Sequence, residues 1–234
     1  MTYRIIYLIL LACLSFNVHA DIGVSPIIVD LTGKEADTEI AVKNGDTQNN
    51  AYVEITPYRL LNPANHAGPK KIARHPETDG LLVFPAKMVL LPSQTQFVRI
   101  VKTAKFLPSD QVYEVDFIPK VSTHMLTQKT SNGSTIGIRV IVGYGARVIL
   151  RPDSPSPSIS AKRINNELVI KNTGNTALRI TSCTQQISNK KIEIPLPAYT
   201  LFTNQTITKE LTRSSRVTLN VSYMEKILEP FYID

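Results

Sequence analysis

The segment from Thr135 to Pro152 reads TIGIRVIVGYGARVILRP and combines three features. Alternate positions in its first half are aliphatic, and an extended strand places them on one face; they are Ile136, Ile138, Val140 and Val142. Gly143 and Gly145 interrupt the strand, and Arg147 then stands among apolar residues. Packing of the strand on its own core explains the aliphatic stripe but not the glycines and the cation.

The composition favours a folded, all-β protein. Hydrophobic residues make up 43% of the 234 positions and charged residues 19%, as in a globular chain rather than a disordered one. β-branched and aromatic residues are frequent, and long runs of strong helix formers are absent. These features are typical of short strands.

Residues 1–20 have the pattern of a secretory signal peptide. Arg4 precedes an apolar run over 5–16 that is too short to span a bilayer, and Val18 and Ala20 suit the positions before a cleavage site. A less favoured alternative makes Cys13, in the box LLAC, the lipidated residue of a lipoprotein. We expect an exported mature chain that does not insert into a membrane.

Charge and cysteine content limit the partners of the mature chain. Without Arg4, 25 basic and 19 acidic residues give a net charge of +6. The cations are scattered and the chain is exported, so the charge favours solubility over nucleic-acid binding. Cys183 is the single mature cysteine, which excludes an internal disulfide and predicts a buried, inert thiol.

A proline-rich connection at 151–158 divides the chain. We expect one domain at 21–152 and a second at 153–234, each a β-sandwich. Long loops are predicted at 62–78 and 120–134. The predicted strands are 24–31, 38–44, 51–61, 81–91, 96–103, 111–119 and 135–150 in the first domain, and 166–172, 176–184, 190–194, 205–211, 215–224 and 228–233 in the second.

An enzyme is not predicted. The chain has no G-x-S-x-G, H-E-x-x-H or C-x-x-C motif and no phosphate-binding glycine loop. His66, His75 and His124 fall in predicted loops. A metal site from His66, His75 and Asp79 is a weaker interpretation than solvated loop histidines, because nothing fixes their geometry. We expect no catalytic residues, no metal and no cofactor.

The segment from Thr135 fits a strand at a sheet edge. Such a strand offers unpaired backbone groups and an apolar stripe, which suit the addition of a strand to another protein. A bulge at Gly143 or Gly145 changes which side chains share a face, so Arg147 can face the same partner as Val142. Arginine is well suited to hold a carboxylate. The alternative is a plain core strand with Arg147 extended at the sheet edge.

Across the mature chain, short motifs in a characteristic order resemble the periplasmic chaperones of the chaperone–usher pathway, which fold and cap fimbrial (pilus) subunits. The similarity is greatest to the alternate branch that serves colonisation-factor fimbriae. The motifs are VSPI (24–27), YVEI (52–55), LNP (61–63), GLLV (80–83), Pro85, LLP (90–92), VRI (98–100), VY (112–113), IP (118–119) and RVILRP (147–152).

The resemblance implies two immunoglobulin-like domains in a boomerang arrangement, with the binding site in and beside the cleft. It implies that the last strand of the first domain is lent to a subunit that lacks its own final strand. The donated residues are then Ile136, Ile138, Val140 and Val142. It also implies that Arg147 anchors the C-terminal carboxylate of the subunit, with arginine where lysine is usual.

The chain departs from the family pattern at two positions. Ile28 stands where many relatives have a second basic anchor, and Ser93 where a glycine commonly follows the proline of LLP. Arg151 matches a residue that joins an ion-pair network between the domains in relatives. Asp110 and Glu225 are the candidate partners of Arg151.

The first hypothesis is an assembly chaperone in the periplasm that passes fimbrial subunits to an outer-membrane usher. The second is a fimbrial structural subunit or two-domain adhesin, and the third an exported hydrolase or metal-binding protein. Subunits typically carry a donor extension at the mature N-terminus and often a disulfide. The stripe is mid-chain here, which favours the chaperone. Whether the free protein caps its own edge as a homo-oligomer is open.

Overall fold

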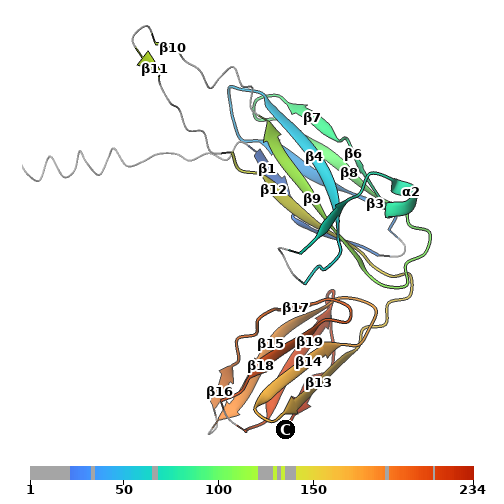
Figure 1. Cartoon of the computed structure of the whole chain (residues 1–234), viewed down its shortest axis with the longest axis vertical. Coiled ribbons are helices and arrows are strands. Elements are labelled where there is room, and N and C mark those ends of the chain that lie inside the picture. The colour runs from blue at the N-terminus through green and yellow to red at the C-terminus, as the bar shows by residue number, and fades with distance from the viewer. Residues whose placement is uncertain are drawn as a thin grey trace, which may run out of the picture.

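The computed structural model describes residues 22–32, 35–64, 68–120, 129–130, 133–134, 141–187, 190–212 and 214–234. Its elements there are strands, apart from the one-turn helix α2 (Pro76–Asp79) (Figure 1). Two groups of sheets, β1 to β12 and β13 to β21, form two β-sandwiches of the immunoglobulin-like class. The predicted all-β class is therefore confirmed.

Two sheets make up the first sandwich. One has the order β1 (Ile22–Ser25), β3 (Asp37–Asn44), β8 (Thr95–Lys102), β6 (Leu81–Phe84). The other has the order β2 (Ile28–Leu31), β12 (Tyr144–Leu150), β9 (Gln111–Lys120), β4 (Ala51–Leu60), β5 (Lys70–Ile72), with β7 (Lys87–Leu90) also on β4. A two-residue pair, β10 (Lys129–Thr130) and β11 (Gly133–Ser134), lies outside both sheets.

The second sandwich also has two sheets. The smaller has the order β13 (Ile159–Ile164), β14 (Glu167–Asn172), β18 (Thr206–Glu210). The larger has the order β16 (Lys190–Glu193), β15 (Leu178–Ile187), β19 (Val217–Tyr223), β20 (Lys226–Ile227), with β17 (Thr200–Leu201) on β15 and β21 (Phe231–Ile233) on β19.

Each sandwich has its own hydrophobic core, because alternate residues of its strands point inward. In β9 the alternation buries Val115 and Phe117 completely and leaves Glu114 and Asp116 on the other face. In the second sandwich Leu219 of β19 is completely buried. The alternation of β9 thus makes one face of its sheet hydrophobic and gives the other a row of carboxylates.

The chain passes between the two cores at 151–158, after β12 ends and before β13 begins. The domain boundary that we propose, after Pro152, falls in this connection. Figure 1 shows the two sandwiches end to end, with their long axes at an angle to each other.

Several predicted strands were wrong in their extent. The strand predicted over 24–31 is two strands, β1 and β2, in different sheets, and 81–91 is likewise divided into β6 and β7. Pro26 and Pro85 stand at these breaks, where proline removes a backbone donor from the ladder. β5 lies within the predicted loop 62–78 and α2 begins within it, and β13 was missed.

Candidate functional site

Arg147 lies in the middle of β12, on the face that points away from the core. Its neighbours Ala146 and Val148 are completely buried, so strand alternation directs the arginine to the opposite face. β12 pairs with β9 from Tyr144 to Leu150. The Arg147 backbone N–H also donates to the carbonyl of Ile27 at 2.8 Å, which fixes the arginine against β2.

The edge of β12 that faces β2 is paired along half of its length. β2 runs parallel to β12 and pairs with Arg147 to Leu150. Within the described part of the chain, no strand pairs with that edge over Tyr144 to Ala146. An unpaired edge offers backbone donors and acceptors to another chain. The open edge therefore begins immediately before Arg147.

The guanidinium of Arg147 has donor capacity to spare. Its side chain is 18% exposed, and Nη2 lies 3.7 Å from Oε2 of Glu114. The buried Nε has no hydrogen-bond partner. Since charge-assisted N–H···O bonds measure about 2.7–2.9 Å, the contact with Glu114 is loose. Among the described residues the guanidinium is thus weakly paired, and it has room for a better acceptor than Glu114.

A second cation lies on the other side of Glu114. Lys70 of β5 places Nζ 3.0 Å from Oε1 of Glu114 and 3.1 Å from Oδ2 of Asp116. The same Nζ lies 4.3 Å from the centre of the Tyr58 ring, within range of a cation–π contact. The Glu114 carboxylate therefore lies between Lys70 and Arg147.

Lys70 and Asp116 both have shifted pKa values. Burial acts against the charged form of Lys70, but hydrogen bonds from Nζ to Glu114 and Asp116 outweigh it, so the pKa of Lys70 is raised. Burial raises the pKa of Asp116, and Lys70 offsets part of this effect. The cluster is therefore polar but partly withdrawn from water.

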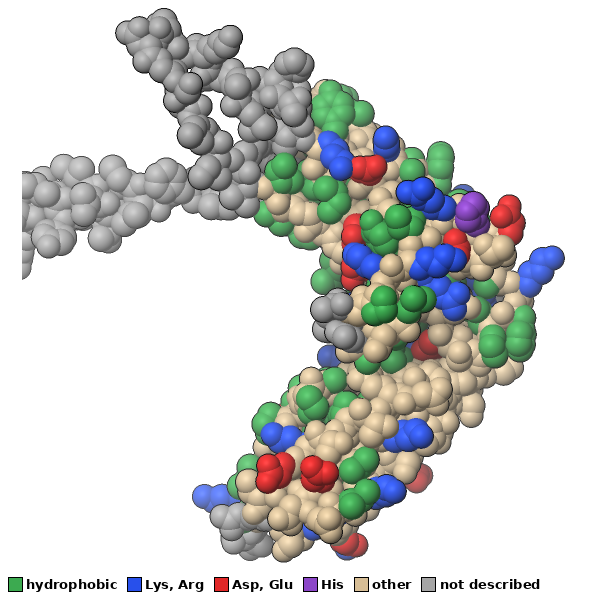
Figure 2. Space-filling model, in the orientation of Figure 1, with side chains coloured by type: hydrophobic (Ala, Val, Ile, Leu, Met, Phe, Trp, Pro, Cys, Tyr) green, Lys and Arg blue, Asp and Glu red, His purple; other side chains and the backbone are tan. Residues whose placement is uncertain are grey.

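Exposed apolar side chains stand beside the cation. Ile28 is directly opposite Arg147 in the parallel ladder and is 62% exposed, and Ile27 is 55% exposed. Ile28, the position that the family resemblance matched to a second basic anchor, is thus adjacent to Arg147 but apolar. Figure 2 shows hydrophobic side chains mixed with charges of both signs on the visible face of the first domain.

The predicted donor residues are mostly outside the described part of the chain: Ile136, Ile138 and Val140 have no described structure. Val142 is described and is 43% exposed, as is Ile141. The prediction of one strand over 135–150 was wrong over 141–143, since β12 begins at Tyr144.

The predicted bulge is absent at Gly145, which pairs regularly with Asp116 in an uninterrupted ladder. The space beside this glycine is tight instead, since a Cβ there would lie 3.3 Å from Cγ of Glu114, and that side chain would have to shift slightly. At Gly143 a Cβ would lie 2.7 Å from Cδ1 of Ile118. Both glycines thus lie close to side chains of β9, Gly143 just before β12 and Gly145 within it.

Arg151, four residues after Arg147, lies at the junction of the two domains and is almost fully bonded. Its Nη1 donates to Asp110 at 2.9 Å, to the Thr176 hydroxyl at 3.2 Å and to the Ala177 carbonyl at 3.2 Å. Its Nη2 lies 2.7 Å from Asp30. Glu225, the other candidate partner, is exposed and forms no ion pair with any described residue.

Asp110 connects the domains in the same network. It accepts from the Thr176 hydroxyl at 3.0 Å and from the Ala177 backbone N–H, both in the second domain. Burial raises the pKa of Asp110, although Arg151 and these hydrogen bonds oppose the shift. A small apolar cluster adjoins it, in which Val112 and Ile149 pack with Ala177 and Phe202. These contacts connect the two domains at their junction.

The other candidate chemistry gains no support from the described residues. His66 and His124 lie outside them, and no group of three or more His, Cys, Asp or Glu residues among them could hold a metal. His75 precedes α2, and its backbone N–H donates to Asp79 at 3.0 Å. Cys183 is buried and unpaired, and burial raises its pKa to about 11. No helix in the described part is long and apolar enough to cross a membrane.

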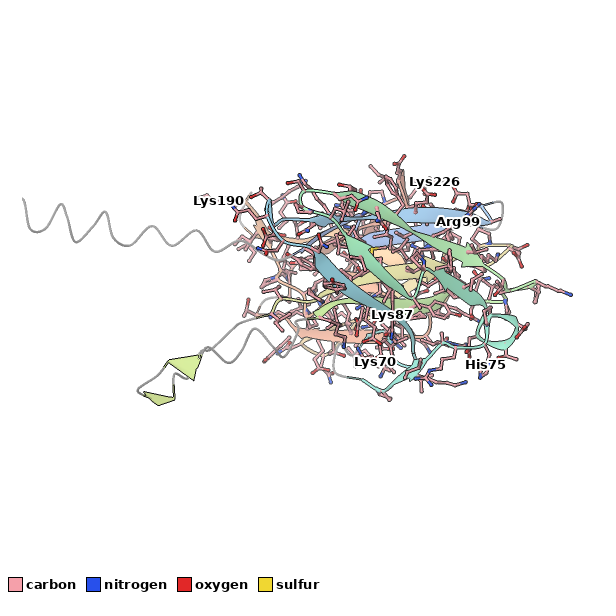
Figure 3. All side chains as sticks on the ribbon, turned by 90° about the horizontal axis from the view of Figure 1, so that it is seen from above. Lys70, His75, Lys87, Arg99, Lys190 and Lys226 are labelled. Carbon is pink, nitrogen blue, oxygen red and sulfur yellow. The ribbon has the colours of Figure 1, made fainter. Side chains whose placement is uncertain are left out.

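Sequence reasoning missed Lys70, Glu114 and Asp116. The alternation of β9 could have shown that Glu114 and Asp116 share its polar face. Lys70 gave no signal, because it lies in a stretch predicted to be a loop and reaches Glu114 across β4. Figure 3 shows Lys70 and Lys87 on one side of the first domain and Arg99 on the other.

Comparisons with known proteins identify similar structures but no similar sequences. No family model and no curated protein matches the chain. A chain from a chaperone–tip adhesin complex of CFA/I fimbriae biogenesis is 17% identical, with a TM-score of 0.68 over 92% of this chain and 99% of that one.

Two further structures extend the comparison. The class 5 fimbriae chaperone CfaA is 16% identical, with a TM-score of 0.67 over 91% of this chain and 99% of that one. A chain from the complex of the SafA pilin with the SafB chaperone of Salmonella enterica is 14% identical, with a TM-score of 0.58 over 91% and 95%. These similarities show that the chain has the two-domain fold of these chaperones.

Proposed function

We propose that this protein is a periplasmic chaperone that binds, folds and caps fimbrial subunits and passes them to an outer-membrane usher. The single observation that carries the proposal is the edge of β12, which no strand of the described residues covers over Tyr144 to Ala146 and which ends at Arg147, an arginine with only a 3.7 Å contact to Glu114. A subunit that lacks a strand is complementary to this edge, because it has an unpaired groove that can accept a strand and a C-terminal carboxylate that an arginine can bind.

The donated residues in this proposal are Ile136, Ile138, Val140 and Val142, and Arg147 is the carboxylate anchor. Four aliphatic side chains buried in a groove contribute about 1.5–3 kcal/mol each. One charge-assisted hydrogen bond contributes about 1.5–3 kcal/mol, and association opposes binding by at least about 4 kcal/mol. The stripe therefore supplies the affinity. Arg147 fixes the register, since a slip by one residue turns every side chain to the other face.

The proposed activity is binding rather than catalysis. Folding of a subunit by this means draws its driving force from burial of the donated strand, and no nucleotide or other cofactor is part of the proposal. Solved relatives in complex with a pilin and with a tip adhesin support subunits as the partners. Export by residues 1–20 to the periplasm is part of the same proposal.

The test is a tagged pull-down from the periplasm of the native host. Wild-type protein should recover fimbrial subunits in stoichiometric amounts, and Val140→Glu should abolish recovery because it places a charge in the apolar groove. Ile192→Glu is the matched control, since Ile192 is 48% exposed on β16 in the second domain. Recovery of subunits by Val140→Glu at the wild-type level would refute strand donation. If the protein itself is found in a heat-stable surface polymer, it is a fimbrial subunit or adhesin instead.

A further inference from the structure

One row of side chains crosses the outer face of the larger sheet of the first domain and contains its own carboxylate. Tyr58 of β4 stands opposite Glu114 of β9, Glu114 opposite Arg147 of β12, and Arg147 opposite Ile28 of β2. Lys70 reaches into this row over the Tyr58 ring. Glu114 is thus an acceptor between two cations, as a bound carboxylate would be.

The two contacts of Glu114 are unequal. Lys70 holds one oxygen at 3.0 Å, whereas Arg147 lies 3.7 Å from the other. Nε of Arg147, buried and without a partner, is not satisfied by Glu114 at all. The carboxylate is therefore bonded to the lysine and only near the arginine.

Lys70 has a second acceptor available if Glu114 moves. Asp116 lies 3.1 Å from Nζ, in the next outward position of β9. Arg147, Lys70, Glu114 and Asp116 have formal charges that sum to zero, so the resting cluster attracts a further carboxylate weakly. Movement of Glu114 away from the arginine leaves Lys70 paired and Arg147 free.

We propose that Glu114 is an internal placeholder, which the C-terminal carboxylate of a bound chain displaces from its place between Arg147 and Lys70. Lys70 is then the second cation of the anchor, in place of the basic residue that Ile28 does not provide. This inference rests on the proposed function, because it assumes that the ligand presents a C-terminal carboxylate. It adds a specific competitor and a specific second cation to that function.

The test uses a synthetic probe, so that it does not depend on the identity of the natural subunit. The probe is the peptide acetyl-Thr-Val-Thr-Val-Tyr with a free C-terminal carboxylate, compared with the same peptide as a C-terminal amide. Each is titrated into the full exported chain while the Nε–H signal of Arg147 is followed by NMR. The acid should shift this signal saturably, and the amide should bind at least tenfold more weakly.

Three variants that each remove one charge then separate the roles. Glu114→Gln removes the competing charge and should tighten binding of the acid about fivefold, the effect of one charge at about 4 Å in water. Lys70→Gln should weaken it by about the same factor, and neither should change binding of the amide. Arg147→Gln should remove the preference for the acid. The backbone fingerprint spectrum of each variant checks its fold.

Lys87→Gln is the matched control. Lys87 lies on the same face, but it pairs with Glu54, six residues along β4 from the partner of Lys70. At about 3.3 Å per residue this is about 20 Å away, beyond the Debye length at physiological salt. Lys87→Gln should leave the affinity for the acid within a factor of two.

The outcomes distinguish this inference from the proposed function. Equal or weaker binding of the acid by Glu114→Gln would overturn the placeholder, and wild-type binding by Lys70→Gln would overturn the second cation. Either result is compatible with normal capture of subunits in the pull-down. Conversely, a pull-down without subunits would refute the proposed chaperone function. The peptide titration could still detect a carboxylate-binding site in that case.

Discussion

Arg147 and Arg151 lie four residues apart on the same side of one segment, yet their surroundings are opposite in character. Arg147 donates its backbone N–H to Ile27, just before β2, and Arg151 donates its own to Leu31 at the end of β2, at 2.8 Å in both cases. Arg151 is surrounded by acceptors from both domains, whereas Arg147 has one distant carboxylate and exposed isoleucines beside it. Nε lacks a hydrogen-bond partner among the described residues in both arginines, so the difference lies in the terminal nitrogens: those of Arg151 are bonded at the domain junction, whereas Nη2 of Arg147 has only the long contact with Glu114. An arginine whose terminal nitrogens are bonded by its own chain holds a structure together, and one with a loose contact is available to a ligand.

The largest predicted effect is a loss of stability when Arg151 at the domain junction is replaced. Arg151→Ala leaves Asp110 buried without its cation, and loss of one partner of a buried pair costs about 3–5 kcal/mol. We expect a loss of this size in the free energy of unfolding, measured by urea denaturation.

The double variant Arg151→Leu with Asp110→Leu is the control for this prediction, since it removes both charges and should recover much of the loss. A loss below about 1 kcal/mol for Arg151→Ala would mean that the junction is solvated and that the two arginines differ little.

Arg147→Ala should have the opposite pattern of effects, with little change in stability and a clear loss of subunit binding. The loose contact with Glu114 contributes about 0–1 kcal/mol to stability, so unfolding should change little. Subunit binding loses a charge-assisted hydrogen bond of about 1.5–3 kcal/mol, which corresponds to about a 10- to 100-fold rise in Kd.

Titration calorimetry or a competition assay with a captured subunit measures this affinity. If both the affinity and the strand register in the complex are unchanged, Arg147 does not bind the subunit carboxylate. The donated strand alone would then form the binding site.

The open edge predicts a difference between two backbone amides of β12. The Arg147 N–H points to β2 and is bonded there, and alternation directs the Gly145 N–H to the same side, where the described residues provide no strand. Gly145 should exchange its amide hydrogen at least about tenfold faster than Arg147 in the free protein.

Hydrogen exchange read by NMR checks this, before and after subunit binding. Binding should slow Gly145 and leave Arg147 as it was. Strong protection of Gly145 in dilute free protein would indicate that the edge is already covered, and a concentration dependence would identify a second copy of the chain as the cover.

The smallest effect concerns pH. Burial raises the folded pKa of Asp116 above its ordinary value of 3.8, so the native state keeps this proton where the unfolded chain has lost it. The stability contributed by this group is complete below pH 3.8 and is lost as the pH rises through the raised value. Relative to Asp116→Asn, the wild type should therefore become less stable as the pH rises above 4.

Urea unfolding of both proteins at pH 4 and pH 6 tests the sign. A relative gain for the wild type would show that Lys70 lowers the pKa of Asp116 by more than burial raises it, and that the cluster is more solvated than its geometry indicates.

Much of the fold could be predicted from the sequence, because strand alternation is a local property. Alternation predicted the all-β class and most strands of both domains, and the run of prolines predicted the connection. The errors lie where Pro26 and Pro85 divide a strand between sheets. The site was less predictable. Arg147 was identified by its place in an apolar run, but its neighbours come from strands that are distant in sequence.

The sequence by itself determined the class of the fold, the identity of the two arginines and the alternation that directs Arg147 away from the core. Only the tertiary structure decided that Arg151 is bonded to residues of both domains, that Glu114 lies between Arg147 and Lys70, and that β2 pairs with only about half of one edge of β12. The physical reason is that periodicity depends on neighbours along the chain. Register and pairing between strands depend instead on packing of the whole sandwich, which no single segment specifies.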